Sequence, residues 1–291
     1  MYTIALLTCQ DFPDLTVSDQ QLIPELFKLG IVADVAIWDD PDINWKKYDA
    51  LVFRNTWDYF IKEDLFFKWI KMLIHNDIKT FNPLKVIVKN AHKFYLKEME
   101  ASGIKIIPSI FISKKSDRTY KDIIPFDWDK AVIKPAISAG SYLTELFDIS
   151  MIDDVQKRYL DIGRDRDLII QKFVPQIQIE GEISMVYFNK KFSHSVLKTP
   201  KKGDFRIQSQ FGGKYRPFNP SEDVLCSAQC IINCIQEELL YARVDGVLVD
   251  SVFHLMELEL IEPDLYVDYM PGALKSFSET IKLFLEKAMI N

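Results

Sequence analysis

The stretch Arg243–Pro263, RVDGVLVDSVFHLMELELIEP, contains the pattern on which the fold assignment depends. Its side chains alternate with a period of two, as in a β-strand, so Glu257 and Glu259 share one face while the intervening leucines point to the other. A turn near Ser251 would fold the stretch into an antiparallel hairpin with position 245 opposite position 257. The sequence therefore predicts that Asp245, Glu257 and Glu259 converge on one patch.

Three carboxylates that converge between hydrophobic strands repel one another, and their pKa values rise. A bound cation removes this repulsion. Ligand sets made only of oxygen favour Mg²⁺ or Mn²⁺ over zinc, and Mg²⁺ commonly combines one or two carboxylates with substrate phosphates. Two interpretations stay open at this point: a metal site, and a solvated acidic strand face in a chain with 42 acidic residues.

A second informative stretch is Ala131–Ser141, AVIKPAISAGS. It predicts a strand that ends at Lys134, followed by a loop of small residues. Such a loop can place backbone N–H groups against phosphate oxygens, and the lysine adds a point charge. A Lys-Pro pair can also mark nothing more than the end of a strand. Lys93, in a predicted helix, has no partner that the sequence identifies and can equally be a surface lysine.

Composition limits the class of protein. The chain has 291 residues, of which 48% are hydrophobic and 27% charged, which is typical of a soluble globular protein with two compact domains or three small ones. A net charge of −6 argues against general nucleic-acid binding. No three glycines fit G-x-G-x-x-G, and no glycines have the P-loop spacing, so nucleotide binding would not use either motif.

The chain's location is predicted from what the sequence lacks. The first residues have no basic region before their apolar run, so they predict a strand and not a signal peptide. No apolar stretch approaches the ~18 residues of a membrane span. Four cysteines do not make a disulfide framework, and the expected compartment is the cytoplasm.

Strand–helix–strand alternation over the first eighty residues predicts a parallel sheet covered by helices. Strands are expected at 2–8, 31–37, 49–54, 106–113, 130–134, 143–147, 167–174, 183–189, 192–198, 242–249 and 254–261. Helices are expected at 18–29, 63–76, 91–102 (with Asn90 as N-cap and Gly103 as its end), 151–161, 221–240 and 273–289. Residues 200–220 hold three glycines and three prolines and predict a long loop, which is more often functional than not.

Two apparent motifs are interpreted as structural. Cys226, Cys230 and Cys234 recur every four residues of a predicted helix, a spacing that differs from the C-x₃-C-x₂-C of cluster-binding loops, so we expect small buried core residues. The aromatic stretch Phe60–Trp69 has helical spacing and is expected in the core.

Taken in order, several phrases together resemble the ATP-grasp superfamily, the fold of glutathione synthetase and D-alanine–D-alanine ligase. The resemblance is strongest to the ATP-grasp cyclo-ligase of the cycloserine pathway and its uncharacterised relatives. It spans about residues 50 to 270 and rests on the ordered set more than on any single phrase. The phrases are RNTWDY (54–59), VIKP (132–135) with the loop SAGS (138–141), QKFVP (171–175), GDFR (203–206), GG (212–213), RVD (243–245) and MELELIEP (256–263).

The resemblance implies an α/β ATP-grasp fold in three parts: an N-terminal parallel-sheet (pre-ATP-grasp) domain at 1–83, a small lobe with a linker helix at 84–172, and a C-terminal lobe carrying the metal site at 173–291. It also implies roles for individual residues. These are phosphate binding by Lys93 and Lys134; a closing loop at Ser138, Gly140 and Ser141; an adenine-binding hinge at Gln171, Lys172, Phe173 and Val174; ribose binding by Glu180; Mg²⁺ ligation by Asp245, Glu257 and Glu259; and stabilisation of the transferring phosphoryl group by Arg206, with Lys134 as the second catalytic residue.

Two departures accompany the resemblance. Many members have Glu-x-Asn on the last metal strand, where this chain has Glu257 and Glu259, which adds negative charge beside the metal and leaves Mn²⁺ possible as well as Mg²⁺. The phosphate loop holds only one glycine, Gly140.

The predicted activity is ATP-dependent, ADP-forming ligation of a carboxylate to an amine through an acyl phosphate, on a small amino-acid-like substrate. A small-molecule kinase and a nucleotide-binding protein without ligase activity stay open as alternatives. Arg54 follows a strand of the first domain, where it could clamp a substrate carboxylate or form a structural salt bridge. Trp57, Asp58, Lys198 and Glu262 are further substrate-pocket candidates. A small-molecule substrate is the expected partner, a second copy of the chain is a further candidate, and nucleic acid and membrane are not expected.

Overall fold

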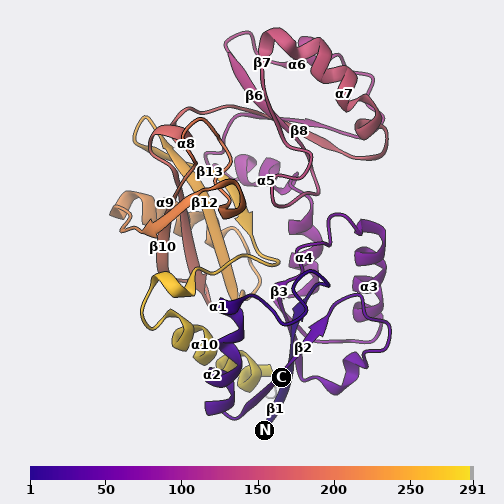
Figure 1. Cartoon of the computed structure of the whole chain (residues 1–291), viewed down its shortest axis with the longest axis vertical. Helices are drawn as coiled ribbons and strands as arrows, with labels where there is room; N and C mark the ends of the chain where they lie inside the picture. The colour runs from indigo at the N-terminus through magenta and orange to yellow at the C-terminus, as the bar shows by residue number, and fades with distance from the viewer. Residues whose placement is uncertain (289–291) are drawn as a thin grey trace.

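The computed structural model describes residues 1–288, Ser209 by its backbone alone, and arranges them around three sheets (Figure 1). The first sheet is parallel, in the order β2-β1-β3-β4, which confirms the prediction for the first eighty residues. Its strands are β1 (Tyr2–Thr8), β2 (Ile31–Ile37), β3 (Ala50–Asn55) and β4 (Thr80–Phe81).

Helices cover both faces of the first sheet. Ala5, Leu7 and Phe53 point toward α3 (Glu63–His75) and α4 (Leu84–Ala91), whose aromatic and aliphatic side chains form one core. The aromatic stretch is part of this core, since Phe66 is fully buried, as predicted. The alternate residues Ile4 and Leu6 pack on the other face, against α2 (Leu22–Lys28) and α10 (Ala273–Ala288).

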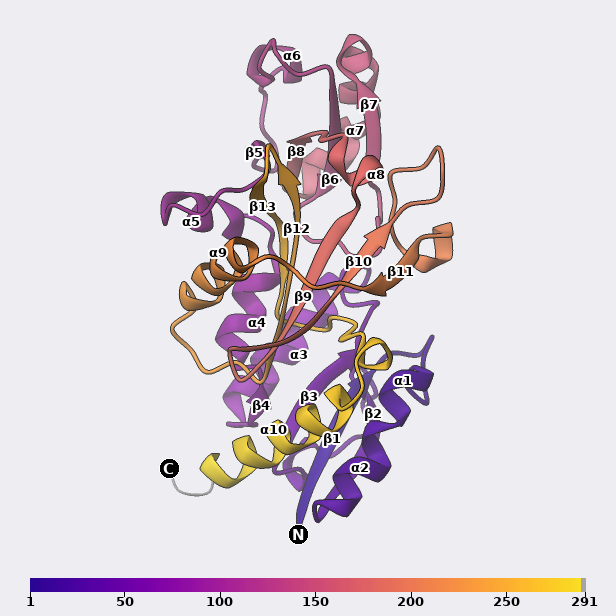
Figure 2. The ribbon, with the colours of Figure 1, turned by 90° about the vertical axis from the view of Figure 1, so that its left-hand side faces the viewer.

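The C-terminal helix thus completes the core of the N-terminal sheet. Figure 2 shows α10 beside α2, along the side of the sheet, although more than two hundred residues separate the two helices. Phe277, Ile281 and Phe284 of α10 are buried there, together with Val186 and Phe188 of the second sheet. The short helix α1 (Val17–Gln20) precedes α2.

The second sheet is antiparallel, in the order β11-β10-β9-β12-β13. One of its faces is apolar and is covered by α9 (Glu222–Asn233), α4 and α5 (Tyr95–Ala101). The opposite face carries most of the charged groups described below. The strands are β9 (Glu182–Phe188), β10 (Lys191–Thr199), β11 (Lys214–Pro217), β12 (Tyr241–Val249) and β13 (Val252–Glu259).

The third sheet is also antiparallel, in the order β5-β8-β6-β7, and lies at the top of Figure 1. The helices α6 (Tyr120–Ile123) and α7 (Ile152–Asp165) cover one face, where Ile133 and Ile170 are buried. The other face carries Lys134 and Gln171 at alternate positions. The strands are β5 (Ser109–Ile112), β6 (Lys130–Pro135), β7 (Glu145–Asp148) and β8 (Leu168–Lys172), and α8 (Gln176–Ile179) follows.

Several sequence predictions are wrong in detail. The helix expected at 91–102 is two helices, α4 and α5, with Lys93 in the break between them. Asn90 is not an N-cap: it lies in the last turn of α4, where its Nδ2 donates to Leu258 O (2.8 Å) and its Oδ1 accepts from Leu260 N (2.9 Å). A polar side chain that the pattern assigned to a cap therefore ties α4 to β13.

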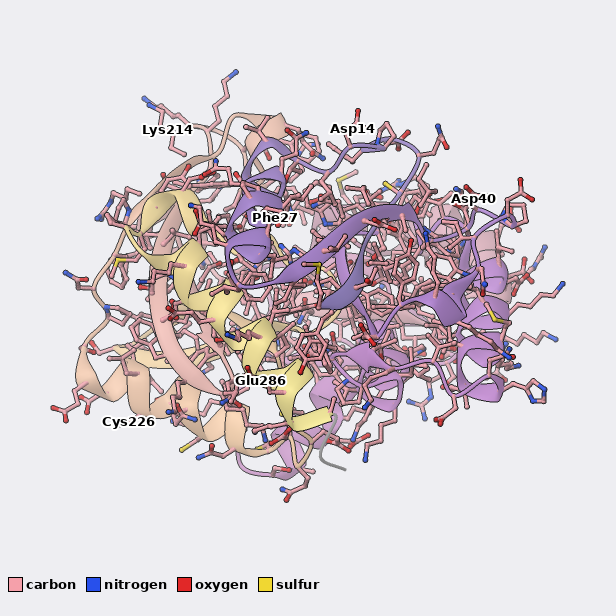
Figure 3. All side chains as sticks on the ribbon, turned by 90° about the horizontal axis from the view of Figure 1, so that it is seen from below. Asp14, Phe27, Asp40, Lys214, Cys226 and Glu286 are labelled. Carbon is pink, nitrogen blue, oxygen red and sulfur yellow. The ribbon has the colours of Figure 1, made fainter. Side chains whose placement is uncertain are left out.

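The region 200–220 is not a continuous loop, since it contains β11, which pairs with the end of β10. The helix expected at 221–240 ends at Asn233. The cysteine prediction is wrong as well: Cys226 and Cys230 are exposed, and Cys234 is partly exposed. Figure 3 shows Cys226 on α9 at the outer edge of the molecule. The apolar face of α9 is formed by other residues, Val224, Ala228, Ile231 and Ile232.

Among residues 1–288, no helix is long and apolar enough to cross a membrane.

Candidate active site

The hairpin of β12 and β13 carries the predicted acidic patch. Its turn consists of Asp250 and Ser251, whose φ angles are both positive (49° and 62°), and the first pair beside the turn is Val249 with Val252. The turn thus lies between two residues and is not centred on Ser251 as expected. Continued from this turn without interruption, the ladder would place position 245 opposite position 256.

A β-bulge at Met256 restores the predicted pairing. The register pairs Asp245 with Glu257 but Gly246 with Leu255, so Met256 is an extra residue on β13. Leu255 lies in the core beneath α9, and strict alternation would send Glu257 to that same side. The bulge instead turns both glutamates of β13 to the opposite, charged face, and the predicted pairing of 245 with 257 is confirmed.

Ion pairs cover the charged face of the second sheet. Lys198 lies 2.5 Å from Glu182, and both side chains are more than nine-tenths buried. Arg243 binds Asp245 (2.8 Å) and also Glu259. Because Lys198 also lies 3.6 Å from Asp245, the two cations and three carboxylates form one connected network.

Glu257 is paired from outside its own sheet. Lys134 Nζ, at the end of β6 in the third sheet, lies 2.7 Å from Glu257 Oε1. Lys93 Nζ, in the break between α4 and α5, lies 3.9 Å from the same oxygen. The two predicted phosphate-binding lysines and one predicted metal ligand therefore meet where the second and third sheets face each other.

Lys93 also holds the loop of small residues that follows β6. Its backbone N–H donates to Ala136 O (2.9 Å), and its Nζ donates to Ser138 O (2.6 Å). The Ser138 hydroxyl in turn donates to Pro135 O (2.9 Å). The start of the predicted phosphate loop is thus tied to one of the predicted phosphate-binding lysines.

The rest of this loop contacts two other parts of the chain. Gly140 and Ser141 have positive φ angles of 59° and 64°. The Ser141 hydroxyl donates to Gln208 Oε1 (3.1 Å), which lies in the loop before β11. The Tyr142 ring packs on Phe60, beyond the end of β3, with 5.1 Å between ring centroids. The loop therefore spans from the third sheet to the first.

Arg206 lies in the loop before β11, away from the acidic network. Its guanidinium binds Asp204 (2.8 Å) and sits 3.8 Å from the centre of the Phe211 ring. These hydrogen bonds hold the pKa of Asp204 well below its usual range. Gln208, two residues after the predicted catalytic arginine, accepts from Ser141 of the phosphate loop.

The predicted adenine-binding hinge follows β8. The buried Gln171 side chain donates to Ser109 Oγ (3.0 Å), and Phe173 N donates to Lys130 O (2.9 Å). Lys172 turns its side chain outward to Asp127 (3.0 Å). The hinge is therefore anchored to β5 and β6 on either side.

Beyond the hinge, Val174 is buried in a small apolar cluster with Ile177 of α8 and Val247 of β12. Glu180, the predicted ribose-binding residue, is exposed immediately after α8. The segment between them crosses from the third sheet to the second.

Arg54 is held in a buried ion pair, the structural one of its two predicted alternatives. It is 1% exposed, and its Nε donates to Asp19 (2.9 Å) while Nη2 donates to Pro263 O (3.1 Å). Through these bonds Arg54 joins the end of β3 to α1 and to the segment after β13.

The other substrate candidates near β3 are also engaged. Trp57 Nε1 donates to Glu262 O (2.9 Å). Asp58 accepts from Trp38 Nε1 (2.6 Å) and pairs with Lys62 (2.6 Å). Both partners of Asp58 thus come from the first 83 residues, and Trp57 fixes the backbone of the next candidate, Glu262.

The sequence of this chain is similar to that of known proteins. Residues 4–82 match the family model described as the N-terminal domain of D-cycloserine synthetase DcsG. Over 266 residues the chain is 21% identical to the cycloserine biosynthesis protein DcsG of Streptomyces lavendulae, covering 87% of this chain and 89% of that protein.

Solved structures extend the match to almost the whole chain. The crystal structure of D-cycloserine synthetase DcsG superposes with a TM-score of 0.87 at 22% identity, covering 97% of this chain and 99% of that one. D-alanine–D-alanine ligase from Bacillus anthracis, complexed with ATP, gives 0.67 at 14%, covering 99% and 98%. A RiPP-associated ATP-grasp ligase of Chryseobacterium gregarium gives 0.69 at 11%, covering 99% and 97%. The chain has the ATP-grasp fold.

Within the ATP-grasp fold of this chain, the carboxyl groups of the network are of two kinds: those whose pKa is lowered and those whose pKa is raised. Burial alone would raise the pKa of Glu257, but Lys134 and Lys93 lower it to about 2. Burial raises the pKa of Glu259 to about 8, although Arg243 opposes this. Burial likewise raises the pKa of Glu262 to about 7, against the effect of Lys93. The site therefore holds more carboxylate than its own cations can satisfy.

The oxygen donors of this site can be compared with those that a metal ion requires. Within residues 1–288, no three His, Cys, Asp or Glu side chains are grouped so that they could hold a metal ion as they stand. Asp245 and Glu257 are instead occupied by Arg243 and Lys134. The donor set is nevertheless all oxygen and in excess over the local cations, which fits a hard divalent cation and not zinc.

The sequence analysis missed several members of this charged cluster. Glu182 and Ser184 share the charged face of β9, and Ser184 donates to Asp245. The period of two that identified Glu257 would also have placed these two residues on one face. Arg243 lies two positions before Asp245 and could have been found in the same way. No local pattern marks Tyr142, whose partner Phe60 is 82 residues earlier.

Proposed function

We propose that this chain is an ATP-dependent, ADP-forming ligase that joins a carboxylate to an amine through an acyl phosphate on a small amino-acid-like substrate. The observation that carries the proposal is the meeting of Lys93 and Lys134 with Glu257 between two sheets. Lysines that can bind phosphate and carboxylates that can bind a metal are there within reach of one another. The likeness to DcsG and to D-alanine–D-alanine ligase supports the same reaction class.

The chemistry needs positive charge more than a nucleophilic side chain. A carboxylate does not acylate an amine in water, because oxide is a poor leaving group. Transfer of the γ-phosphoryl group of ATP to the carboxylate gives an acyl phosphate, which the amine attacks with loss of phosphate. Phosphoryl transfer depends on positioning and on neutralising the charge of the equatorial oxygens.

In this proposal Lys93 and Lys134 bind the phosphates of ATP. When a phosphate takes the place of Glu257 on Lys134, the Glu257 carboxylate becomes free. Asp245, Glu257 and Glu259 would then hold Mg²⁺, with Mn²⁺ as a second candidate. Bound there, the ion would neutralise phosphate charge during transfer.

The remaining residues bind and enclose the nucleotide. The loop of Ser138, Gly140 and Ser141 closes over the phosphates and excludes water from the acyl phosphate. The backbone of the hinge, with Gln171, Lys172, Phe173 and Val174, binds adenine, and Glu180 binds the ribose. Arg206 reaches the transferring phosphoryl group once its guanidinium leaves Asp204.

Further properties of the chain belong to the same proposal. They are the division into an N-terminal domain (1–83), a small lobe (84–172) and a C-terminal lobe (173–291), a cytoplasmic location, a small-molecule partner and association with a second copy. The packing of α10 on the first sheet crosses the division, so these parts share core residues.

A small-molecule kinase is the second candidate, because both activities require the same phosphate contacts. The test is ADP release from Mg-ATP with a panel of D- and L-amino acids in the presence of hydroxylamine. ADP together with a hydroxamate supports the ligase and names the acyl donor. ADP without hydroxamate supports the kinase. Absence of ADP with every amino acid, despite ATP binding, would contradict an amino-acid substrate.

A further inference from the structure

Lys93 lies in a break between two helices, and His92 precedes it. Residues 92–94 belong to neither α4 nor α5, and His92 has an extended backbone (φ −103°, ψ 111°). The Lys93 N–H donates outside both helices, to Ala136 O (2.9 Å) at the start of the phosphate loop that follows β6. The orientation of Lys93 therefore depends on a segment that is distant in the sequence.

Three hydrogen bonds close a ring around this break. His92 Nε2 donates to Asp167 Oδ2 (2.9 Å), Ala136 N donates to Asp167 O (2.8 Å), and Lys93 N donates to Ala136 O. The peptide bond between His92 and Lys93 completes the ring. Because Ala136 follows β6 and Asp167 precedes β8, the ring fastens the break to the ladder that joins these two strands.

The contacts of the His92 ring identify the nitrogen that donates. Phe94 N donates to Nδ1 (3.4 Å), and because a ring nitrogen that accepts carries no proton, Nε2 is the donor to Asp167. The other carboxylate oxygen of Asp167 accepts from Lys114 N (2.6 Å), in the segment after β5. Backbone groups on either side thus hold both members of the pair in one orientation.

The residue before Asp167 contacts the other end of the phosphate loop. The Arg166 guanidinium lies 6.0 Å from the centre of the Tyr142 ring, and its Nη1 donates to Phe60 O (3.5 Å). Asp167 contacts Ala136, the first residue after β6, and Arg166 contacts Tyr142. Residues 166–167 therefore support the phosphate loop at both of its ends.

The pair of His92 and Asp167 contributes little to the core of the protein. Its side chains are 31% and 24% exposed, and they line a cavity of about 130 Å³ together with Ile137 and Arg166. Partly exposed pairs of this kind usually add little to the stability of a fold. What depends on the pair is local: the position of Lys93 relative to the phosphate loop, whose Ser138 carbonyl accepts from its Nζ.

We propose that His92 and Asp167 are positioning residues for Lys93, which hold it and the start of the phosphate loop in the relation that phosphate binding requires. This rests on the proposed function, in which Lys93 binds the phosphates of ATP, and it adds two residues that act through Lys93 and not on the nucleotide itself. A displacement of about 1 Å in a group that binds the reacting atoms can cost roughly 100-fold in rate. Loss of the ring should therefore weaken phosphate binding even though the charge of Lys93 remains.

The test is a double-mutant cycle on the binding of Mg-ATP, measured by calorimetry. The proteins are the wild type, His92→Ala, Lys93→Met and the double variant. We expect His92→Ala to weaken binding about 10-fold and Lys93→Met to weaken it at least as much. The double variant should match Lys93→Met, because a residue that acts through Lys93 has no effect once Lys93 is absent.

Further variants separate positioning from folding. His92→Gln keeps an amide that can donate to Asp167 and should keep most of the Mg-ATP affinity. Added imidazole should restore binding to His92→Ala, because the removed ring leaves space beside an existing cavity. His75→Ala, at the exposed end of α3, is the control and should bind as the wild type does. The denaturant concentration at the midpoint of unfolding should be similar in all of these variants.

The inference is overturned if His92→Ala binds Mg-ATP as well as the wild type, if the effects of the two substitutions add in the double variant, or if neither glutamine nor imidazole restores binding. The assay of ADP and hydroxamate tests the proposed function separately. Affinity that depends on His92 through Lys93, with ADP but no hydroxamate, would leave the inference standing and contradict the ligase. Hydroxamate formed by His92→Ala with unchanged Mg-ATP affinity would do the reverse. Absence of Mg-ATP binding to the wild type would contradict both.

Discussion

Lys134 Nζ lies 2.7 Å from Glu257 Oε1, and this pair joins the third sheet to the second. The contact explains how oppositely charged groups remain stable between two sheets without a ligand. It also gives a direct test, because both residues are proposed to change partner when nucleotide binds.

Glu257→Ala should abolish Mg²⁺-dependent turnover while leaving the fold intact. Removing this carboxylate takes away a proposed metal ligand and leaves Lys134 free to bind phosphate. Turnover, circular dichroism and nucleotide affinity without Mg²⁺ are the measurements. The matched control is Glu237→Ala, which removes a carboxylate paired with Lys85 at the surface. Unchanged turnover in Glu257→Ala would contradict the metal assignment.

Gly246→Ala should destabilise the protein by roughly 1–3 kcal/mol. A Cβ atom at Gly246 would lie 2.4 Å from both His254 O and the Phe253 ring, beside the bulge in β13. Denaturant unfolding measures the loss. Gly163→Ala is the control, since its closest contact would be 3.3 Å from a flexible leucine side chain. Equal stability of the two variants would show that the hairpin relaxes freely.

Asn90→Ala should lower both stability and turnover. Its amide joins α4 to Leu258 and Leu260, which flank Glu259, and loss of the side chain leaves a buried backbone group without a partner. The expected cost is about 1–3 kcal/mol. Asn76→Ala provides a comparison, because that amide bonds only within its own helix end. If Asn90→Ala unfolds at the wild-type denaturant concentration, the bridge contributes nothing.

Tyr142→Ala should increase the share of ADP that forms without a ligated product, because the Tyr142 ring holds the phosphate loop on Phe60. A loop released from this contact would admit water to the acyl phosphate. The ratio of ADP to hydroxamate measures the effect. Tyr142→Phe keeps the ring and should keep the wild-type ratio. An unchanged ratio in Tyr142→Ala would mean that the aromatic contact does not hold the loop closed.

Stability should fall as pH rises from about 5 to 9 in the presence of a chelator. Burial raises the folded-state pKa of Glu259 to about 8 and that of Glu182 to about 7, against an ordinary value of 4.5. The folded protein then holds protons that the unfolded chain has released, so the free energy of unfolding decreases with pH. Melting temperature against pH checks this, and Glu259→Gln should flatten the curve. A melting temperature that rises over this interval would contradict it.

The same reasoning gives the opposite sign below pH 4.5. The folded-state pKa of Glu257 is about 2, because Lys134 and Lys93 outweigh the effect of burial. The stability from this carboxylate is fully present above its ordinary pKa of 4.5 and is lost as pH falls toward 2. Lys134→Met should reduce the loss on the acid side.

The sequence was informative where a short pattern has one physical outcome. The period of two in Arg243–Pro263 placed Glu257 and Glu259 on one face, and the run that ends at Lys134 gave a strand followed by a loop. The pairing of 245 with 257 was right although its premise was not, because the turn lies between Asp250 and Ser251 and a bulge at Met256 compensates. Bulges depend on packing against the neighbouring strand, which alternation alone does not contain.

Other features depend on contacts between distant segments. Asn90 has the composition of a helix cap, but its partners come from β13. The cysteines of α9 have helical spacing that is equally compatible with an exposed face, and nothing in the pattern identifies the side that the sheet covers. The sequence allows two roles for Arg54, and the ion pair that it forms depends on the position of Asp19 in α1.

The position of α10 has a consequence for how the protein is made. A ribosome releases the first sheet early, when the face that carries Ile4 and Leu6 still lacks the helix that will cover it. That face is complete only after residues 273–288 have left the exit tunnel, so a segment made early waits for one made much later. The interval offers chaperones an apolar surface to hold, and a truncation before α10 would leave that face of the first sheet exposed.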